Sequence, residues 1–198
     1  GLDTVFEINS PLDVRHIQNL ANMAKAGTFT YAGRSSQGDA KFAGGECAMF
    51  TGSAGAQGGI EKAGKVDYSV NFLPYYSDVK GAPQNSIIGG ASLWVMAGKP
   101  ADHYKGIAQF FNYLSGTPVQ EKWHEDTGYL PITKAAYEKT KASGFYEKNP
   151  ILQVALKELT NKPPTENARG LRFGNMAQLR DVFAEEFEAA LAGKKSPK

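Results

Sequence analysis

The chain has 198 residues, which is enough for one substantial hydrophobic core. Its formal net charge is +2, and Lys and Arg are spread along the sequence, which argues against a nucleic-acid-binding protein with a concentrated basic face. No run approaches the roughly 20 apolar residues of a membrane span, so we expect no insertion into a membrane.

Helical signals begin near the N-terminus. Ser10 is a candidate N-cap and Pro11 suits the first helical position, so a helix is predicted over about 11–26, ended by Gly27. Thr117-Pro118-Val119-Gln120 predicts a capping box at the start of a later helix, and Asn175 can cap the last one. The further predicted helices are 38–44, 54–63, 102–115, 117–127, 150–160 and 176–192.

Three segments have the pattern of β-strands. Residues 66–72 alternate between apolar and polar side chains, which is the period of a half-buried strand. Residues 46–50 and the apolar run 87–96 suit buried strands, and the glycine pair at 89–90 marks a bend or a close backbone approach. Single strands spaced among helices predict the α/β class without strict βαβ units.

The sequence lacks the patterns of most cofactor sites. The three histidines are far apart and no Cys/His cluster exists, so we expect neither a metal nor another cofactor. Residues 59–65 imitate a phosphate-binding loop, but Val66 stands where Ser or Thr must reach magnesium. Residues 51–55 imitate a nucleophile elbow with Thr51 in place of the first glycine, so a serine hydrolase using Ser53 stays open as a less favoured alternative.

Three glycine-containing segments could bind an anionic, polyhydroxylated ligand. Ser53 lies in a glycine-rich turn after a predicted strand, where free N–H groups and its hydroxyl suit an anion. Gly90 lies within the apolar run, and Tyr129 lies in a Gly-Tyr-Leu-Pro turn that could expose its ring. By themselves, a capping serine, a strand bulge and a packed loop aromatic remain the favoured interpretations.

Arg180 carries a sharper signal. It shares one face of the predicted 176–192 helix with Met176, Phe183 and Phe187. A guanidinium on an apolar stripe is costly unless it reaches water or meets an anion. An ion pair with Asp or Glu and a phosphate contact both fit, and Arg suits phosphate through its planar, bidentate fork.

Several motifs resemble, in order, one protein family: the periplasmic sn-glycerol-3-phosphate receptors of ABC importers, among the extracellular solute-binding proteins. They are residues 5–9 (VFEIN), 45–57 (GECAMFTGSAGAQ), 73–76 (LPYY), 81–85 (GAPQN), 88–96 (IGGASLWVM), 127–131 (TGYLP), 161–164 (NKPP) and 174–180 (GNMAQLR). The resemblance covers essentially the whole chain.

The resemblance implies a periplasmic-binding-protein-like fold of type II, similar to maltose-binding protein, in which two α/β lobes close on the ligand. It implies capture of glycerol-3-phosphate, and of glycerophosphodiesters as a wider range, in the periplasm, with delivery to the membrane permease subunits of an ABC importer and no catalysis. Ser53, Gly90, Tyr129 and Arg180 are the ligand contacts that it implies. A sugar-binding receptor of the same fold is the alternative within this class.

The resemblance also implies a division into lobes. Residues 1–85 and 136–198 are expected in the second lobe, and residues 86–135 are expected to cross over and belong mostly to the first. Members of the family carry a signal peptide and an entire first lobe before the residue equivalent to Gly1, and further helix after Lys198. We therefore expect this chain to be a fragment that holds only part of the cleft, with Trp94, Phe110 and Phe111 exposed.

Overall fold

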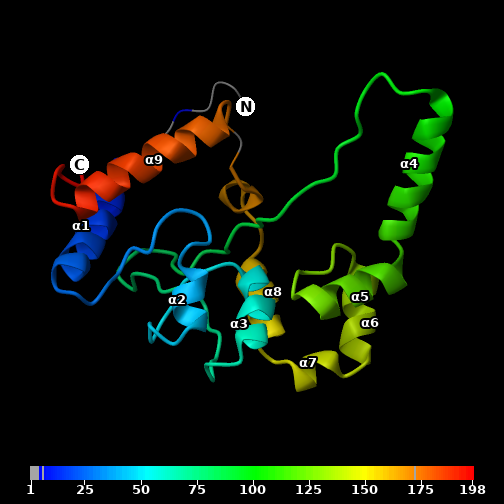
Figure 1. The fold of residues 1–198 in the computed structure, drawn as a ribbon, viewed down its shortest axis with the longest axis horizontal. Coiled ribbons are helices and arrows are strands. Elements are labelled where there is room, and N and C mark those ends of the chain that lie inside the picture. The colour runs from blue at the N-terminus through cyan, green and yellow to red at the C-terminus, as the bar shows by residue number, and fades with distance from the viewer. Residues whose placement is uncertain (1–4, 6, 172) are drawn as a thin grey trace. The chain divides into compact units, whose positions relative to one another are not determined.

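A computed structural model describes residue 5, residues 7–171 and residues 173–198, as helices joined by irregular segments (Figure 1). The helices are α1 (Pro11–Lys25), α2 (Asp39–Ala43), the 3₁₀ turn η1 (Ala54–Ala56), α3 (Gln57–Ala63), α4 (Ala101–Leu114), α5 (Thr117–Thr127), α6 (Lys134–Ala142), α7 (Phe145–Lys148), α8 (Leu152–Leu159), the 3₁₀ turn η2 (Glu166–Arg169) and α9 (Met176–Leu191). None of the helices among these residues is long and apolar enough to cross a bilayer.

The chain divides into two compact units. The first combines Gly1–Lys41 with Leu171–Lys198, and the second is Phe42–Gly170. In the first unit α1 packs against α9, so the two ends of the described chain lie in the same unit (Figure 1).

The predicted first helix is confirmed, with its cap. The Ser10 hydroxyl accepts a hydrogen bond from the backbone N–H of Asp13 at 3.3 Å, and the Asp13 carboxylate accepts from the backbone N–H of Ser10 at 3.3 Å. Pro11 occupies the first turn, and Gly27 follows the helix with a φ of 74°. This reciprocal capping satisfies N–H groups that a helix start leaves unpaired.

The capping box predicted at 117–120 is wrong. Gly116, not Thr117, is the N-cap of α5, and the Gln120 side chain donates to the carbonyl of Leu114 at 2.6 Å instead of closing a capping box. Thr117 already has helical geometry, so its hydroxyl is one position too late to cap. Asn175 is the N-cap of α9 as predicted, in the left-handed conformation, but its side chain makes no capping hydrogen bond.

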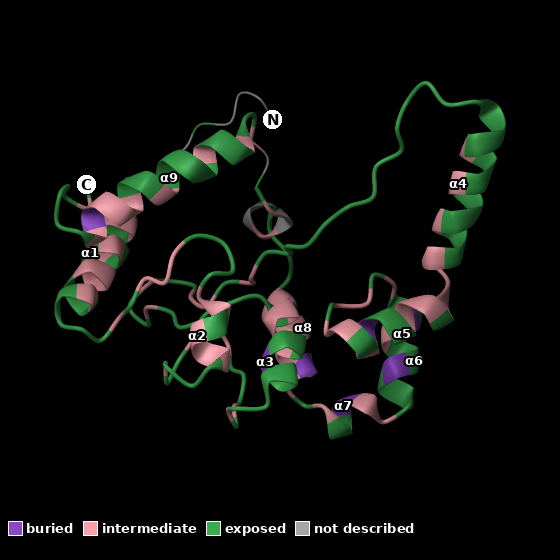
Figure 2. Ribbon diagram, viewed as in Figure 1, coloured by how far each residue is buried: buried purple, intermediate pink, exposed green. Residues whose placement is uncertain are grey.

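The core of the second unit gathers on α5, α6 and α7 (Figure 2). α6 packs against both α5 and α7, and a salt bridge of 2.6 Å joins Lys139 of α6 to Glu121 of α5. The buried residues of these helices are His124, Ala136, Thr140 and Tyr146. Neither α6 nor α7 was predicted from the sequence, although these two helices carry the buried Ala136, Thr140 and Tyr146.

The described residues contain no β-strand, contrary to the expectation for residues 46–50, 66–72 and 87–96. A strand needs a neighbouring strand to pair its N–H and C=O groups, and these segments lie beside none. Ile88 and Trp94 are 68% and 86% exposed, so the run 87–96 keeps its apolar side chains in water. The α/β class is therefore not visible in this part of the chain. Phe110 is exposed as expected, whereas Phe111 is half-buried.

Candidate functional site

Ser53 begins the short turn that leads into α3. It is exposed, and its Oγ accepts a hydrogen bond of 3.2 Å from the backbone N–H of Gly55, so it caps η1. The capping interpretation is thus confirmed. The hydroxyl proton has no acceptor within the part of the chain that the structure describes, so it can donate to a ligand while the oxygen still caps.

Tyr129 lies against this same turn. A Cβ placed on Gly55 would lie 3.1 Å from both Cζ and the hydroxyl oxygen of Tyr129, so the absence of a side chain at Gly55 lets the ring approach the backbone. The Tyr129 side chain is 47% exposed. The structure therefore brings together two of the four predicted contacts, Ser53 and Tyr129, from segments about 75 residues apart in the sequence.

The loop before Tyr129 is fixed by the end of α5. Gly128 ends α5 in the left-handed conformation, with φ 73°, and its N–H donates to the carbonyl of His124 at 2.9 Å. A Cβ on Gly128 would contact the side chains of Leu152 and Gln57, and its positive φ would strain any other residue. A glycine is thus required at the point where α5 turns toward the Ser53 turn.

Gly90 is placed differently from these residues. It is exposed, has a φ of 102°, and a Cβ built on it would meet no atom within 4 Å. The backbone conformation suits glycine, but the described residues supply no strand for the expected bulge. The structure does not bring Gly90 to the Ser53 turn.

Arg180 is exposed on α9, in the first unit. The predicted helix is confirmed, but the apolar stripe is only partly formed, because Phe183 is 45% exposed. Among the described residues Arg180 forms no hydrogen bond or ion pair. Arg180 therefore reaches water, which is one of the two conditions under which a guanidinium on an apolar stripe is tolerated, and no ion pair with a described residue occupies its side chain.

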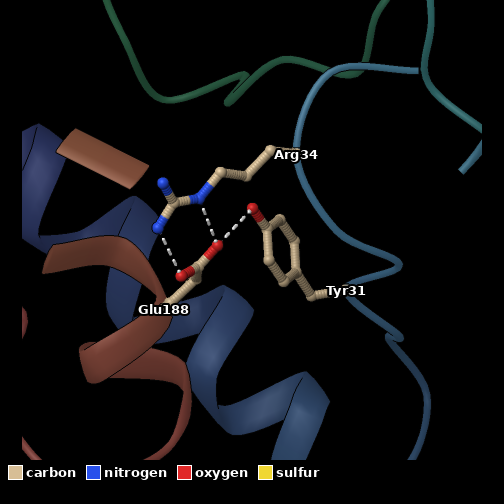
Figure 3. Close-up of polar contacts among 3 residues, drawn as sticks. All are labelled: Tyr31, Arg34 and Glu188. Carbon is tan, nitrogen blue, oxygen red and sulfur yellow. Dashed lines mark hydrogen bonds and ion pairs between the residues drawn. The ribbon is translucent and has the colours of Figure 1, made fainter. Parts of the chain in front are cut away.

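The C-terminal half of α9 is anchored at Glu188 (Figure 3). The Glu188 carboxylate accepts hydrogen bonds of 2.8 Å from Nε and from Nη2 of Arg34, and one of 3.1 Å from the Tyr31 hydroxyl. The Phe187 ring meets Tyr31 edge-on, with 5.5 Å between centroids. The hydrogen bond from Arg34 lowers the pKa of Glu188 below its ordinary value. α9 thus carries Arg180 on a helix that is held at its other end.

Neither a metal-binding cluster nor the cavity of the second unit contains the predicted contact residues. No group of three or more His, Cys, Asp and Glu side chains among the described residues is placed to hold a metal ion. A cavity of about 240 Å³ in the second unit is lined by Gln84, Asn85, Pro163, Thr165 and Ala168. None of the four predicted contacts lines it.

Comparison with known families decides the class. The family described as bacterial extracellular solute-binding protein matches residues 3–154. The chain belongs to this family. Membership implies a periplasmic-binding-protein-like fold, and a binding role rather than a catalytic one.

The chain is also similar to individual curated proteins within this family. The chain is 52% identical over 197 residues to the sn-glycerol-3-phosphate-binding periplasmic protein UgpB of Yersinia enterocolitica, covering all of this chain and 45% of that protein. It is 53% identical over 198 residues to the protein of the same name from Brucella abortus, again with 45% of that protein covered. The chain therefore spans less than half the length of the curated relatives that it matches.

Proposed function

We propose that the full-length protein captures sn-glycerol-3-phosphate in the periplasm and delivers it to the permease of an ABC importer, without catalysis. The observation that carries the proposal is 52–53% identity over the whole chain to relatives whose names state this ligand and this compartment. The proposed ligand range extends to glycerophosphodiesters, because they contain the same glycerol-3-phosphate group.

We propose Ser53, Gly90, Tyr129 and Arg180 as the ligand contacts of this chain. Support comes from the exposed Tyr129 ring beside the Ser53 turn, where a hydroxyl donor and an aromatic face border the same spot. An exposed Arg180 with no partner among the described residues adds a guanidinium that is free to pair with an anion. Gly90 is supported only by the motif that contains it.

We propose that the chain contributes to two α/β lobes. Residues 1–85 and 136–198 would belong to the second lobe, and residues 86–135 mostly to the first. The exposed apolar run 87–96 supports the assignment of that run to the first lobe, since a strand of that composition would be covered by partner strands from the rest of a two-lobed receptor. α5 lies in the same range but packs against α6, so its part of the range would stay with the second lobe. Residues 46–50 and 66–72 would become strands by the same pairing.

A serine hydrolase using Ser53 is disfavoured by the surroundings of that hydroxyl. Ser53 Oγ accepts from the Gly55 N–H, and both ring nitrogens of His124 are engaged by Tyr129 and Tyr146. A nucleophilic serine needs a base within hydrogen-bond reach. No described histidine is bonded to Ser53.

A sugar-binding receptor is the second candidate function. The exposed ring of Tyr129 favours it, because an aromatic face can cover the apolar face of a sugar. Arg180 argues for an anion instead, since a neutral sugar leaves the guanidinium charge uncompensated.

Titration calorimetry of the full-length protein separates these candidates. We expect saturable binding of sn-glycerol-3-phosphate, with no competition from neutral sugars and no release of glycerol or inorganic phosphate. Competition by a neutral sugar would favour the second candidate. Release of either product at enzymatic rates would overturn the binding role.

A further inference from the structure

His124 lies in the core of the second unit and is 1% exposed. Its ring lies within 5.5 Å of Tyr146 and 5.8 Å of Phe145, measured between centroids. Both of its nitrogens are hydrogen-bonded: Nδ1 to the backbone carbonyl of Tyr129, and Nε2 to the Tyr146 hydroxyl at 2.9 Å. A buried histidine with both nitrogens engaged is fixed in position and in orientation.

The hydrogen bond to a carbonyl oxygen shows which ring nitrogen of His124 carries a proton. A carbonyl oxygen only accepts, so Nδ1 of His124 carries the hydrogen and donates it to Tyr129. Nε2 of His124 shares its hydrogen bond with the Tyr146 hydroxyl, a group that can both donate and accept. A phenol is protonated at neutral pH, and burial, with smaller effects from Tyr137 and Glu125, raises the pKa of Tyr146 further, to about 12.

These bonds act directly on Tyr129. Its backbone N–H donates to Oγ1 of Thr127 at 3.2 Å, and its carbonyl accepts from His124. The backbone carbonyl of His124 also accepts a hydrogen bond from the N–H of Gly128. His124 is therefore bonded both to Gly128, where α5 ends, and to Tyr129, the next residue. With its backbone held at both groups, Tyr129 keeps its ring beside Gly55.

We propose that His124 and Tyr146 are positioning residues that hold the ligand contact Tyr129 against the Ser53 turn. The proposal rests on the proposed function for the role of Tyr129, and it adds two residues that the ligand need not touch. Its physical content is preorganisation: a ring already in place loses less freedom when ligand binds. The alternative is that His124 only fills the core between α5 and α7.

Three variants of the full-length protein separate these roles. His124→Ala removes the donor to Tyr129, whereas His124→Asn keeps an N–H donor near the position of Nδ1. Ala136→Gly is the matched control, because Ala136 is fully buried on α6 in the same core and makes no side-chain hydrogen bond. Tyr146→Phe is a milder fourth variant in case His124→Ala does not fold.

A ligand-free readout comes first. 3-Fluorotyrosine placed at position 129 reports the surroundings of the ring through its ¹⁹F resonance. We expect His124→Ala and Tyr146→Phe to move this resonance toward its value in unfolded protein, and His124→Asn and Ala136→Gly to leave it nearly in place. An unmoved resonance in both of the first two variants, or an equal shift in Ala136→Gly, overturns the proposal whether or not the protein binds glycerol-3-phosphate.

The affinity for sn-glycerol-3-phosphate then tests whether the placement of the Tyr129 ring matters for ligand binding. We expect His124→Ala to weaken binding about tenfold, the effect of roughly one hydrogen bond, and His124→Asn to recover most of the loss. In a Tyr129→Ala background His124→Ala should cause little further loss, because the two residues act as one unit. Additive losses, or a harmless Tyr129→Ala, would overturn the positioning role. A wild-type protein that does not bind this ligand would instead overturn the proposed function.

Discussion

Arg34 holds Glu188 by two parallel hydrogen bonds, Nε to Oε1 and Nη2 to Oε2, both 2.8 Å long (Figure 3). The pair joins the segment after α1 to α9, across 154 positions of sequence. A fork-to-fork contact of this kind fixes direction as well as distance. It therefore sets the placement of the helix that carries Arg180 within the first unit.

The acid sensitivity of the first unit should depend on Glu188. Arg34 lowers the folded-state pKa of Glu188 below its ordinary value of about 4.5. The stabilisation is therefore complete above that value and is lost as the pH falls through the folded-state pKa. We expect Glu188→Gln to lower the melting temperature at pH 7, and the difference from wild type to shrink below about pH 4.5.

Glu186→Gln is the matched control for this measurement. Glu186 lies on the same helix and pairs with Lys195 at 2.7 Å, with both side chains more than half exposed. An isolated exposed pair contributes little, so we expect a smaller change at pH 7. Equal effects of the two substitutions across the pH range would contradict an anchoring role for Glu188.

Arg180 should affect affinity and not stability. A charge-assisted hydrogen bond to phosphate contributes about 1.5–3 kcal/mol, so Arg180→Ala should weaken binding of sn-glycerol-3-phosphate by at least about tenfold. The affinity of Arg180→Lys should lie between those of the wild type and Arg180→Ala, since lysine keeps the charge and loses the planar, bidentate guanidinium. Because Arg180 is exposed, we expect an unchanged melting temperature without ligand, not the relief of desolvation that a buried stripe would give. Val182→Ala, at an exposed neighbour on α9, is the control.

Two glycine substitutions near Ser53 should have different consequences, one for ligand affinity and the other for stability. A Cβ on Gly55 would lie 3.1 Å from the Tyr129 ring, so Gly55→Ala should displace the ring and weaken ligand binding several-fold. A Cβ on Gly59, within α3, meets nothing within 4 Å, so Gly59→Ala should raise the free energy of unfolding by about 0.5–1 kcal/mol with affinity unchanged. Calorimetry and chemical denaturation of both variants measure the two effects. Equal affinity in Gly55→Ala and wild type would remove the Tyr129 contact.

The run 87–96 should gain strand hydrogen bonds in the full-length protein. The chain produced alone leaves this segment irregular and exposed, so its amides should exchange with deuterium rapidly. In the full-length protein we expect strong protection, because partner strands would pair the backbone. The amides of α4 are the internal control, since their helical bonds are local and should be protected in both. Rapid exchange of 87–96 in the full-length protein would contradict the proposed lobe division.

The local elements were largely determined by the sequence. Ser10, Pro11 and Asp13 specify the start of α1 because a capping box is made within four consecutive residues. Gly128 specifies the end of α5 because only the conformation of its own backbone is involved. The capping serine at position 53 and the family motifs were readable for the same reason.

Other features were decided only by the tertiary structure. That Tyr129 lies against Gly55, and that Arg34 rather than another cation meets Glu188, depends on contacts between residues about 75 and 154 positions apart. No local pattern predicted that His124 would be buried between Tyr129 and Tyr146, although its spacing of five from Tyr129 across a glycine helix end was an available signal. For the predicted strands the local pattern was present but the tertiary partner was not. Residues 66–72 alternate between apolar and polar side chains, yet no neighbouring strand in the described chain pairs with them. Local hydrogen bonds follow from neighbouring residues, whereas burial, ion pairing and strand formation require a second segment to be in place.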